Sequence, residues 1–181
     1  KAILENVVDT NRGTTLGDGD VKIYTVEHLL SSIYALKIDN LFIEIDNIEP
    51  PIFDGSSKTF IHGINEAGII ELDEKKEFLI VSKPITFYDD KKDIKMKISP
   101  SNFFSISFEC DFPFGNIGKQ KYHLESLDQY VDEISNARTF CSLDDLMYLK
   151  ENNLINGGDI NTGIVFLNNN NSGDLKNIKE N

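Results

Sequence analysis

Residues 25–35 read Thr-Val-Glu-His-Leu-Leu-Ser-Ser-Ile-Tyr-Ala, and this stretch carries the clearest helix signal in the chain. Its apolar residues recur at the spacing i, i+3, i+4, i+7, which is the apolar stripe of an amphipathic helix. They are Val26, Leu29, Leu30 and Ile33. Thr25 belongs to the residue types that cap helix N-termini, so we predict a helix that starts there. An acid and an imidazole, Glu27 and His28, then lie in its first turn.

The segments that follow this helix complete a small unit. Residues 40–46 alternate between apolar and other side chains, which is typical of a half-buried strand. Asp54-Gly55-Ser56 is a turn sequence, in which the Asp side chain bonds the backbone two residues on. A second amphipathic helix is expected over residues 58–67, and Gly68 is its stop signal. Together they predict a β-α-α-β-like unit that ends near residue 72.

The second half of the chain repeats this mixture of elements. The charged stretch 73–77 resembles a solvated linker. Strand patterns are expected at residues 78–81, 85–88, 94–98 and 104–112. Ser126 and Gln129 form a capping-box pattern that opens another amphipathic helix. We therefore predict an α+β fold of two similar β-α-α-β sandwich domains, residues 1–73 and 74–181, with the second domain incomplete.

Composition narrows the possible partners. The chain has 181 residues and a net charge of −12, with a pI near 4.6. This charge argues against nucleic acid as the main partner, because phosphate binding needs basic patches. The two cysteines, Cys110 and Cys141, suggest no disulfide scaffold, so a reducing cytosol is the expected compartment. No apolar run is long enough for a transmembrane helix.

On local physics alone, the role of Glu27 and His28 stays open. A Glu in the first helical turn is what the helix dipole favours. A lone His is more often a satisfied polar residue than a ligand. The alternative is chemical: a general base and a metal ligand that share one water molecule.

Four motifs in order decide in favour of chemistry. They are Thr-Val-Glu-His-Leu at 25–29, Ile-Asp-Asn at 38–40, Pro-Ile-Phe-Asp-Gly-Ser at 51–56 and Ala-Arg-Thr-Phe at 137–140. This set resembles the zinc-dependent UDP-3-O-acyl-N-acetylglucosamine deacetylases (LpxC) of lipid A biosynthesis. The resemblance implies a cytoplasmic zinc hydrolase that removes the N-acetyl group of a UDP-sugar lipid and releases acetate. It also implies that the acyl chain brings the enzyme near the membrane surface.

The resemblance assigns roles to individual residues. It implies that His28 is a zinc ligand and that Glu27 is the general base for the zinc-bound water. Thr139 would donate its hydroxyl to the oxyanion that develops on the attacked carbonyl. Asp54 would support the metal site from the outer shell. Without the motif, Thr139 would be interpreted as a helix C-terminal residue that bonds backbone.

Substrate-binding residues are implied as well. Phe112 matches the aromatic position that packs on the uracil ring, although a core residue at a strand end is an equal alternative. Residues 141–166 resemble the insert that forms the acyl-chain passage. Phe140, just before this insert, and Leu146 and Gly158 within it are the other substrate-binding residues that the resemblance implies. The apolar residues of this insert are equally typical of a short amphipathic helix.

The sequence also departs from the family pattern. Cys141 stands where a Gly usually follows the Phe. The chain has three histidines, His28, His62 and His123. The family's His-Lys-x-x-x-Asp and Gly-x-x-His motifs are not found, and neither is its opening strand. We therefore expect a fragment whose remaining zinc ligands lie beyond Asn181.

Since a catalytic zinc needs about three protein ligands, the 181-residue chain alone is expected to bind zinc weakly and to be inactive. The alternative function is a truncated, non-catalytic paralogue. Such a protein would bind a nucleotide-sugar or acyl ligand without metal.

Overall fold

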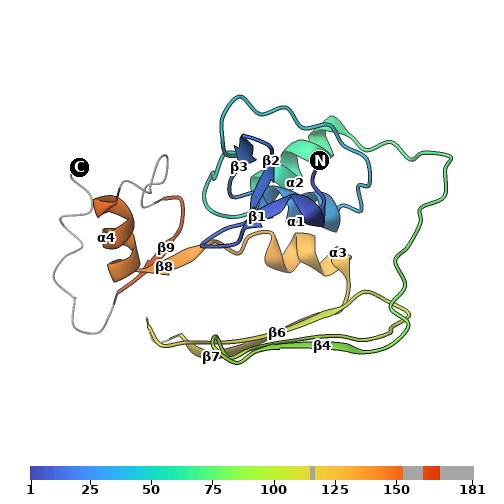
Figure 1. The fold of residues 1–181 in the computed structure, drawn as a ribbon. Helices are drawn as coiled ribbons and strands as arrows, with labels where there is room; N and C mark the ends of the chain where they lie inside the picture. The colour runs from blue at the N-terminus through green and yellow to red at the C-terminus, as the bar shows by residue number, and fades with distance from the viewer. Residues whose placement is uncertain (115–116, 153–160, 168–181) are drawn as a thin grey trace.

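The computed structural model describes residues 1–114, 117–152 and 161–167 and has a mixed α+β architecture (Figure 1). Its first part is a small antiparallel sheet with the strand order β1-β2-β3, followed by two helices. The elements are η1 (Leu4–Asn6), β1 (Val7–Asp9), β2 (Thr15–Asp18), β3 (Val21–Ile23), α1 (Glu27–Ala35) and α2 (Lys58–Ala67).

The second part consists of two antiparallel hairpins, β4–β5 and β6–β7, and a parallel strand pair, β8–β9. The elements are β4 (Ile85–Asp89), β5 (Ile94–Ile98), β6 (Ile106–Phe112), β7 (Gly118–Leu124), α3 (Leu127–Gln129), the π-helical segment η2 (Tyr130–Ile134), β8 (Phe140–Ser142), α4 (Leu143–Glu151) and β9 (Ile164–Phe166). In Figure 1, α3 lies between the hairpins and the helices of the first part, and α4, β8 and β9 extend to one side.

The buried apolar side chains among the described residues are few and lie mainly on or next to the helices. Val26 and Ala35 are each 4% exposed at the two ends of α1, and Ile61 of α2 is 5% exposed. Leu124 at the end of β7 and Leu143 at the start of α4 complete this set. The apolar stripe predicted for α1 is only partly buried: Val26 is buried, whereas Leu29, Leu30 and Ile33 are half-buried. The buried positions within the helix are Ser32 and Ala35.

Several predicted elements are confirmed. The second helix spans Lys58–Ala67 as expected, and Gly68 ends it at φ +84°. The strands expected near residues 85–88 and 94–98 form the hairpin β4–β5. The alternating run ending at Phe112 forms β6, which starts at Ile106. The helix expected after Ser126 is confirmed only in part, because α3 has three residues and continues as the π-helical segment η2. Ser126 is its N-cap residue but makes no side-chain cap bond, and Gln129 accepts a 2.7 Å hydrogen bond from the amide of Glu125.

Two expected strands are wrong. Residues 40–46 and 78–81 form no strand, although their sequences have strand character. Their apolar side chains point into solvent: Phe42 is 99% and Leu79 98% exposed. A strand requires a neighbouring backbone ladder as well as a suitable pattern. No part of the described structure supplies one to these segments.

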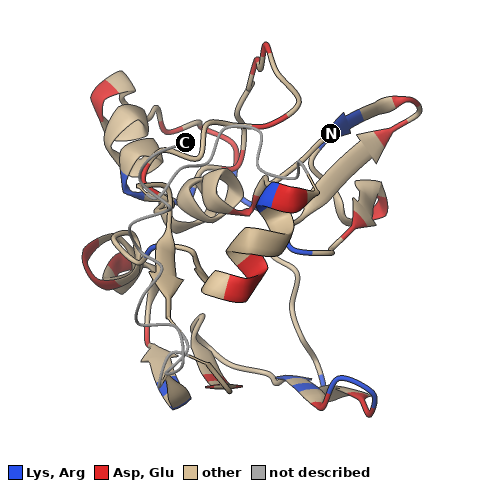
Figure 2. Ribbon diagram, turned by 90° about the vertical axis from the view of Figure 1, so that its left-hand side faces the viewer, with Lys and Arg blue, Asp and Glu red and all other residues tan. Residues whose placement is uncertain are grey.

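The domain boundary near residue 73 stays a prediction. Residues 68–84 carry no helix or strand and connect the two parts of the fold. Acidic segments are spread over several elements in Figure 2, as the net charge of −12 leads one to expect. Among the described residues, no helix is long and apolar enough to span a membrane.

Candidate functional site

The backbone immediately before α1 is strained. Thr25 has φ +53°, a conformation that is a true outlier for a β-branched residue. Thr25 therefore does not cap the helix as predicted, and α1 begins after Val26 without a side-chain cap. The Thr25 hydroxyl instead donates a 2.9 Å hydrogen bond to Oε1 of Glu49. Strain of this kind costs about 1–3 kcal/mol and is typical of functional sites.

Glu27 is held by the turn between β1 and β2. The amide of Thr14 donates a 2.9 Å hydrogen bond to Oε2 of Glu27, and the amide of Val26 donates to the carbonyl of Thr14. Gly13 lies against the other carboxylate oxygen, so that a Cβ atom there would be 3.1 Å from Oε1. The turn thus fixes the direction of a carboxylate in the first turn of α1. An oriented carboxylate of this kind can accept a proton.

His28 is half-buried next to it. Its carbonyl oxygen accepts hydrogen bonds of 2.9 Å from the hydroxyls of both Ser31 and Ser32. Its imidazole makes no hydrogen bond to any part of the chain that the structure describes. The same residues contain no cluster of three or more His, Cys, Asp or Glu side chains that could hold a metal ion. His28 is the one histidine next to Glu27 in the sequence, and the described residues do not by themselves make a zinc site.

The loop of residues 54–57 contains the predicted turn. Oδ1 of Asp54 accepts from the Ser56 hydroxyl at 2.6 Å and from the Ser56 amide at 3.1 Å. The Ser56 hydroxyl is the main cause that lowers the pKa of Asp54, and Arg138 adds to the effect. The turn is therefore confirmed. Asp54 uses this oxygen within its own loop, and its role near a metal stays a prediction.

This loop connects α1 to Thr139. On one side, the buried hydroxyl of Ser32, which donates to the His28 carbonyl at 2.9 Å, also lies 3.3 Å from the carbonyl oxygen of Ser57. On the other, the amide of Thr139 donates to the carbonyl of Gly55 at 2.8 Å. The helix with Glu27 and the segment with Thr139 thus contact the same four-residue loop.

Thr139 lies in an irregular segment and not at a helix C-terminus, so the structural alternative for this residue is wrong. Its carbonyl accepts from the amide of Ile164 at 2.9 Å. Arg138 donates from Nε to the carbonyl of Asp54 at 2.6 Å, and from Nη2 to the carbonyls of Asn161 and Gly163. One guanidinium therefore binds three carbonyls of two backbone segments near Thr139, the loop at Asp54 and the stretch of residues 161–163. Within the described structure the Thr139 hydroxyl makes no hydrogen bond, and the residue is exposed.

Phe112 and Phe140 come together in an aromatic cluster. Their ring centroids are 5.1 Å apart in an edge-to-face arrangement. Phe114 and Phe166, which sequence reasoning missed, complete the cluster with centroid distances of 5.6 to 6.3 Å. The spacing Phe-Pro-Phe at 112–114 was the available signal. Both proposed aromatic contacts therefore lie on one surface formed by β6, β8 and β9.

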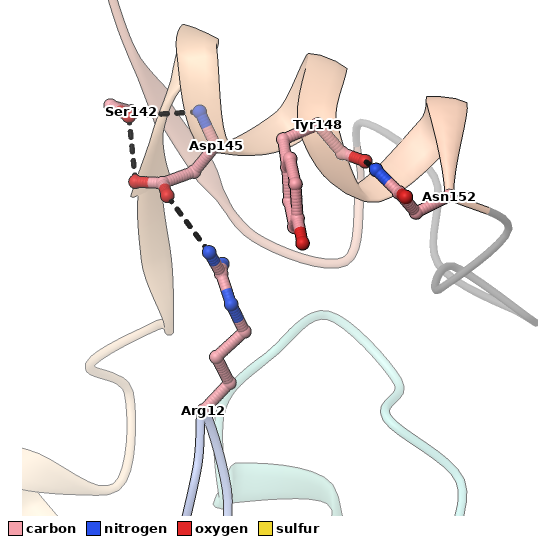
Figure 3. Close-up of polar contacts among 5 residues, drawn as sticks. All are labelled: Arg12, Ser142, Asp145, Tyr148 and Asn152. Atoms are coloured by element: carbon pink, nitrogen blue, oxygen red, sulfur yellow. Dashed lines mark hydrogen bonds and ion pairs between the residues drawn. The ribbon is translucent and has the colours of Figure 1, made fainter.

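The start of the proposed acyl-passage insert is a helix, α4, with Leu143 1% exposed and Leu146 half-buried. The expected helix is confirmed, but of its apolar residues only Leu143 is buried, and Met147 is 51% exposed. The passage itself stays a prediction. Gly158 lies outside the described residues. Asp145 accepts from the Ser142 hydroxyl at 2.7 Å, and it forms an ion pair with Arg12 that sequence reasoning missed (Figure 3).

A cavity of about 650 Å³ runs along α1. Its lining includes Glu27 and Thr14 from the first part of the fold and Phe104 and Ile106 from the second. The other lining residues are Leu30, Ser31, Ile33, Tyr34 and Ile38. His28, Thr139 and Phe112 are not among them. The described structure therefore brings Glu27 to a largely apolar cavity without bringing all predicted site residues into one pocket.

These features define an α+β protein in which an oriented acid–imidazole pair at a helix start is connected to an exposed threonine through one short loop. Comparison with known proteins is more specific. The family model for UDP-3-O-acyl N-acetylglycosamine deacetylase (LpxC) matches residues 1–180, and the chain belongs to this family.

Named relatives agree with this assignment. The chain is 44% identical over 163 residues to a UDP-3-O-acyl-N-acetylglucosamine deacetylase of Aliarcobacter butzleri, covering 89% of this chain and 54% of the relative. It is 43% identical over 160 residues to the deacetylase of Nautilia profundicola, with 88% and 54% covered. A bifunctional LpxC/FabZ enzyme of Chlorobaculum tepidum is 38% identical over 167 residues, which is 92% of this chain and 36% of that enzyme. The chain thus spans about half, or less, of the length of these relatives.

Proposed function

We propose that this chain provides the general base and the oxyanion-binding group of a deacetylase that hydrolyses the N-acetyl group of UDP-3-O-acyl-N-acetylglucosamine. The observation that carries the proposal is the Glu27 carboxylate, aimed by the Thr14 amide beside His28 at the start of α1. Membership of the deacetylase family supplies the reaction and the substrate class. The proposed compartment is the cytoplasm, as the family resemblance implies.

The mechanism assigns one step to each side chain. Glu27 takes a proton from the attacking water, and the Thr14 amide keeps its carboxylate in the accepting orientation. Thr139 donates a hydrogen bond from its hydroxyl to the oxyanion as the carbonyl carbon becomes tetrahedral. When this intermediate collapses, the C–N bond breaks, the sugar nitrogen takes up a proton and leaves as the amine, and acetate is released. Because Arg138 ties the carbonyls of Asp54 and Gly163 on either side, the Thr139 backbone is fixed before substrate arrives.

His28 is proposed as one ligand of a zinc ion. The described residues alone do not complete the coordination, because a catalytic zinc needs about three protein ligands. We propose that the other ligands belong to the sequence after residue 181. Asp54 is proposed to support this region through its loop, and Phe112, Phe140, Leu146 and Gly158 are proposed to contact substrate. The two-sandwich arrangement with a boundary near residue 73 is proposed as the frame that holds them.

The test is acetate release from UDP-3-O-acyl-N-acetylglucosamine by the full polypeptide that the gene encodes. Glu27→Gln should lower kcat by about 10²–10⁴-fold, the usual contribution of a general base, with zinc content unchanged. The matched control is Glu66→Gln, an exposed glutamate on α2, which should keep full activity. His28→Ala should lower the zinc content. Activity of Glu27→Gln near the control's level would disprove the base assignment, and unchanged zinc in His28→Ala would remove this ligand.

A further inference from the structure

The turn that orients Glu27 is tied to a helix far away in the sequence. Nη2 of Arg12 lies 3.2 Å from Oδ1 of Asp145, which is 133 residues further along the chain. The guanidinium carbon also lies 5.5 Å from the centroid of the Tyr148 ring. Figure 3 shows the Arg12 side chain reaching from its turn to α4, where Asp145 and Tyr148 face it. Arg12 thus makes two contacts to one helix.

Asp145 is itself fixed on α4. Its amide donates to the Ser142 hydroxyl at 3.0 Å, and that hydroxyl donates back to Oδ2 at 2.7 Å. The other carboxylate oxygen, Oδ1, is the one that meets Arg12. The Ser142 hydroxyl, first of all, and then Arg12 lower the pKa of Asp145, so that the carboxylate is charged at neutral pH. The partner of Arg12 is therefore a rigid anion at the N-terminus of a helix.

The backbone of the turn is shaped for this contact. Arg12 has φ +62°, which glycine adopts without cost but other residues adopt rarely. Two residues on, Thr14 donates its amide to Glu27. The intervening Gly13 is packed against the same carboxylate. A shift of Arg12 must therefore move the donor that aims Glu27.

We propose that Arg12 is a positioning residue that couples α4 to the Glu27 carboxylate through the turn of residues 12–14. The role rests on the proposed function of Glu27 as general base. Stability is not a sufficient explanation for the contact: the side chains of Arg12 and Asp145 are 46% and 40% exposed, and exposed pairs add little to folding. The consequence that we propose for the Arg12–Asp145 contact is the orientation of the Glu27 carboxylate, because misplacement of a catalytic group by about 1 Å can cost about 100-fold in rate.

The first experiment measures whether the Arg12–Asp145 contact protects the Thr14 amide, and it does not depend on deacetylase activity. Hydrogen exchange of the Thr14 amide is followed in the full polypeptide and in Arg12→Ala and Asp145→Asn. Both variants should exchange this amide several-fold faster than the parent. The matched control is Asp128→Asn, which removes another helix-start aspartate, one that pairs with Lys37 at 2.8 Å. It should leave exchange at Thr14 unchanged. Unchanged exchange in Arg12→Ala would overturn the proposal.

The second experiment measures deacetylation per folded molecule. Arg12→Ala should lower kcat by about 10- to 100-fold with little change in KM, whereas a purely structural role would lower only the folded fraction. The double variant Arg12→Ala/Asp145→Asn should be no slower than the slower single variant, because both remove one contact. The charge exchange Arg12→Asp/Asp145→Arg should recover part of the lost rate. Additive losses, or a loss of kcat equally large in Asp128→Asn, would refute the coupling.

Variants of Tyr148 test the ring contact of Arg12 separately from its ion pair with Asp145. Tyr148→Phe keeps the aromatic face and should behave like the parent, and Tyr148→Leu should lower kcat less than Arg12→Ala does. If Tyr148→Phe lowers kcat as much as Tyr148→Leu, the ring contact is wrong. Failure of the parent enzyme to deacetylate would disprove the proposed function, and the exchange experiment would still decide whether the tie exists.

Discussion

Gly55 offers the most direct test of how the loop of residues 54–57 meets the Thr139 segment. A Cβ atom at Gly55 would overlap the carbonyl oxygen of Thr162 and would lie 3.0 Å from Cγ2 of Thr139. Contacts that close cannot persist, so the two segments must separate in Gly55→Ala. Gly55 also has φ +83°, which is unfavourable for alanine.

The expected loss of stability has two parts. Backbone strain at positive φ costs about 1–3 kcal/mol. Overpacking against a fixed carbonyl adds about 1–3 kcal/mol. Gly68→Ala is the matched control, because Gly68 has φ +84° and a Cβ atom there would meet no described atom within 4 Å. The control should show the first cost alone, so the two variants should differ by about 1–3 kcal/mol.

The assay is urea denaturation followed by far-ultraviolet circular dichroism, with the free energy of unfolding taken from the linear extrapolation. Gly55→Ala should also lose deacetylase activity beyond its loss of folded protein, since Thr139 donates its amide to the Gly55 carbonyl. Equal destabilisation by Gly55→Ala and Gly68→Ala would refute the reasoning. It would mean that loop 54–57 and Thr162 are not packed together in solution.

Two further predictions concern the surroundings of this loop. The Tyr130 hydroxyl donates to Ser31 at 2.7 Å and lies 2.9 Å from the Ser57 hydroxyl, so Tyr130→Phe should lower the free energy of unfolding by about 1–3 kcal/mol. Tyr122 is the control, because its exposed hydroxyl donates to Glu133. In the same urea assay, Tyr122→Phe should lower the free energy of unfolding by about 0.5 kcal/mol or less. Equal losses in the two variants would count against the part-buried hydrogen bonds of Tyr130 with Ser31 and Ser57. The lowered pKa of the Asp54 carboxyl, caused mainly by the Ser56 hydroxyl, predicts stability that is present above the unfolded pKa near 4 and lost as pH falls through the folded value. Urea midpoints measured between pH 2 and 6 should show this loss, and a Ser56→Ala variant with the same slope would contradict it.

Local patterns were sufficient where an element depends on its own residues. The helix of residues 58–67 has both an apolar stripe and a glycine stop, and the structure ends it at that glycine. The turn of Asp54-Gly55-Ser56 is closed by its own aspartate, so its chemistry is also local. Hairpin β4–β5 pairs two strands close in sequence. In these cases the stabilising contacts lie within one short stretch.

Sequence patterns failed to predict elements whose formation depends on a contact with another part of the chain. Residues 40–46 alternate like a strand, but alternation specifies only which side each residue faces and supplies no ladder partner. The sheet β1-β2-β3 was not predicted, because strands of three or four residues are too short to show a period. Thr25 is a residue type that often caps helices, yet its hydroxyl donates a hydrogen bond to Glu49 and its backbone is strained.

The candidate site shows the same division between residue identity and residue placement. Motifs identified Glu27, His28 and Thr139 one by one. The Thr-Val-Glu-His-Leu motif does not contain Thr14, which orients Glu27, whereas Arg138 lies in the same motif as Thr139, although the pattern does not say what its guanidinium contacts. Glu27 is aimed by an amide 13 residues away, and that turn is tied to α4 across 133 residues.

Thr139 depends on its neighbour Arg138, whose guanidinium binds carbonyls of two separate loops. A lysine could not replace this arginine without loss, since only the planar guanidinium offers several donors in a fixed geometry. The positions of the proposed base and the proposed oxyanion donor are therefore set by two arginines, Arg12 and Arg138. Each fastens a strained or irregular backbone segment to a distant part of the fold.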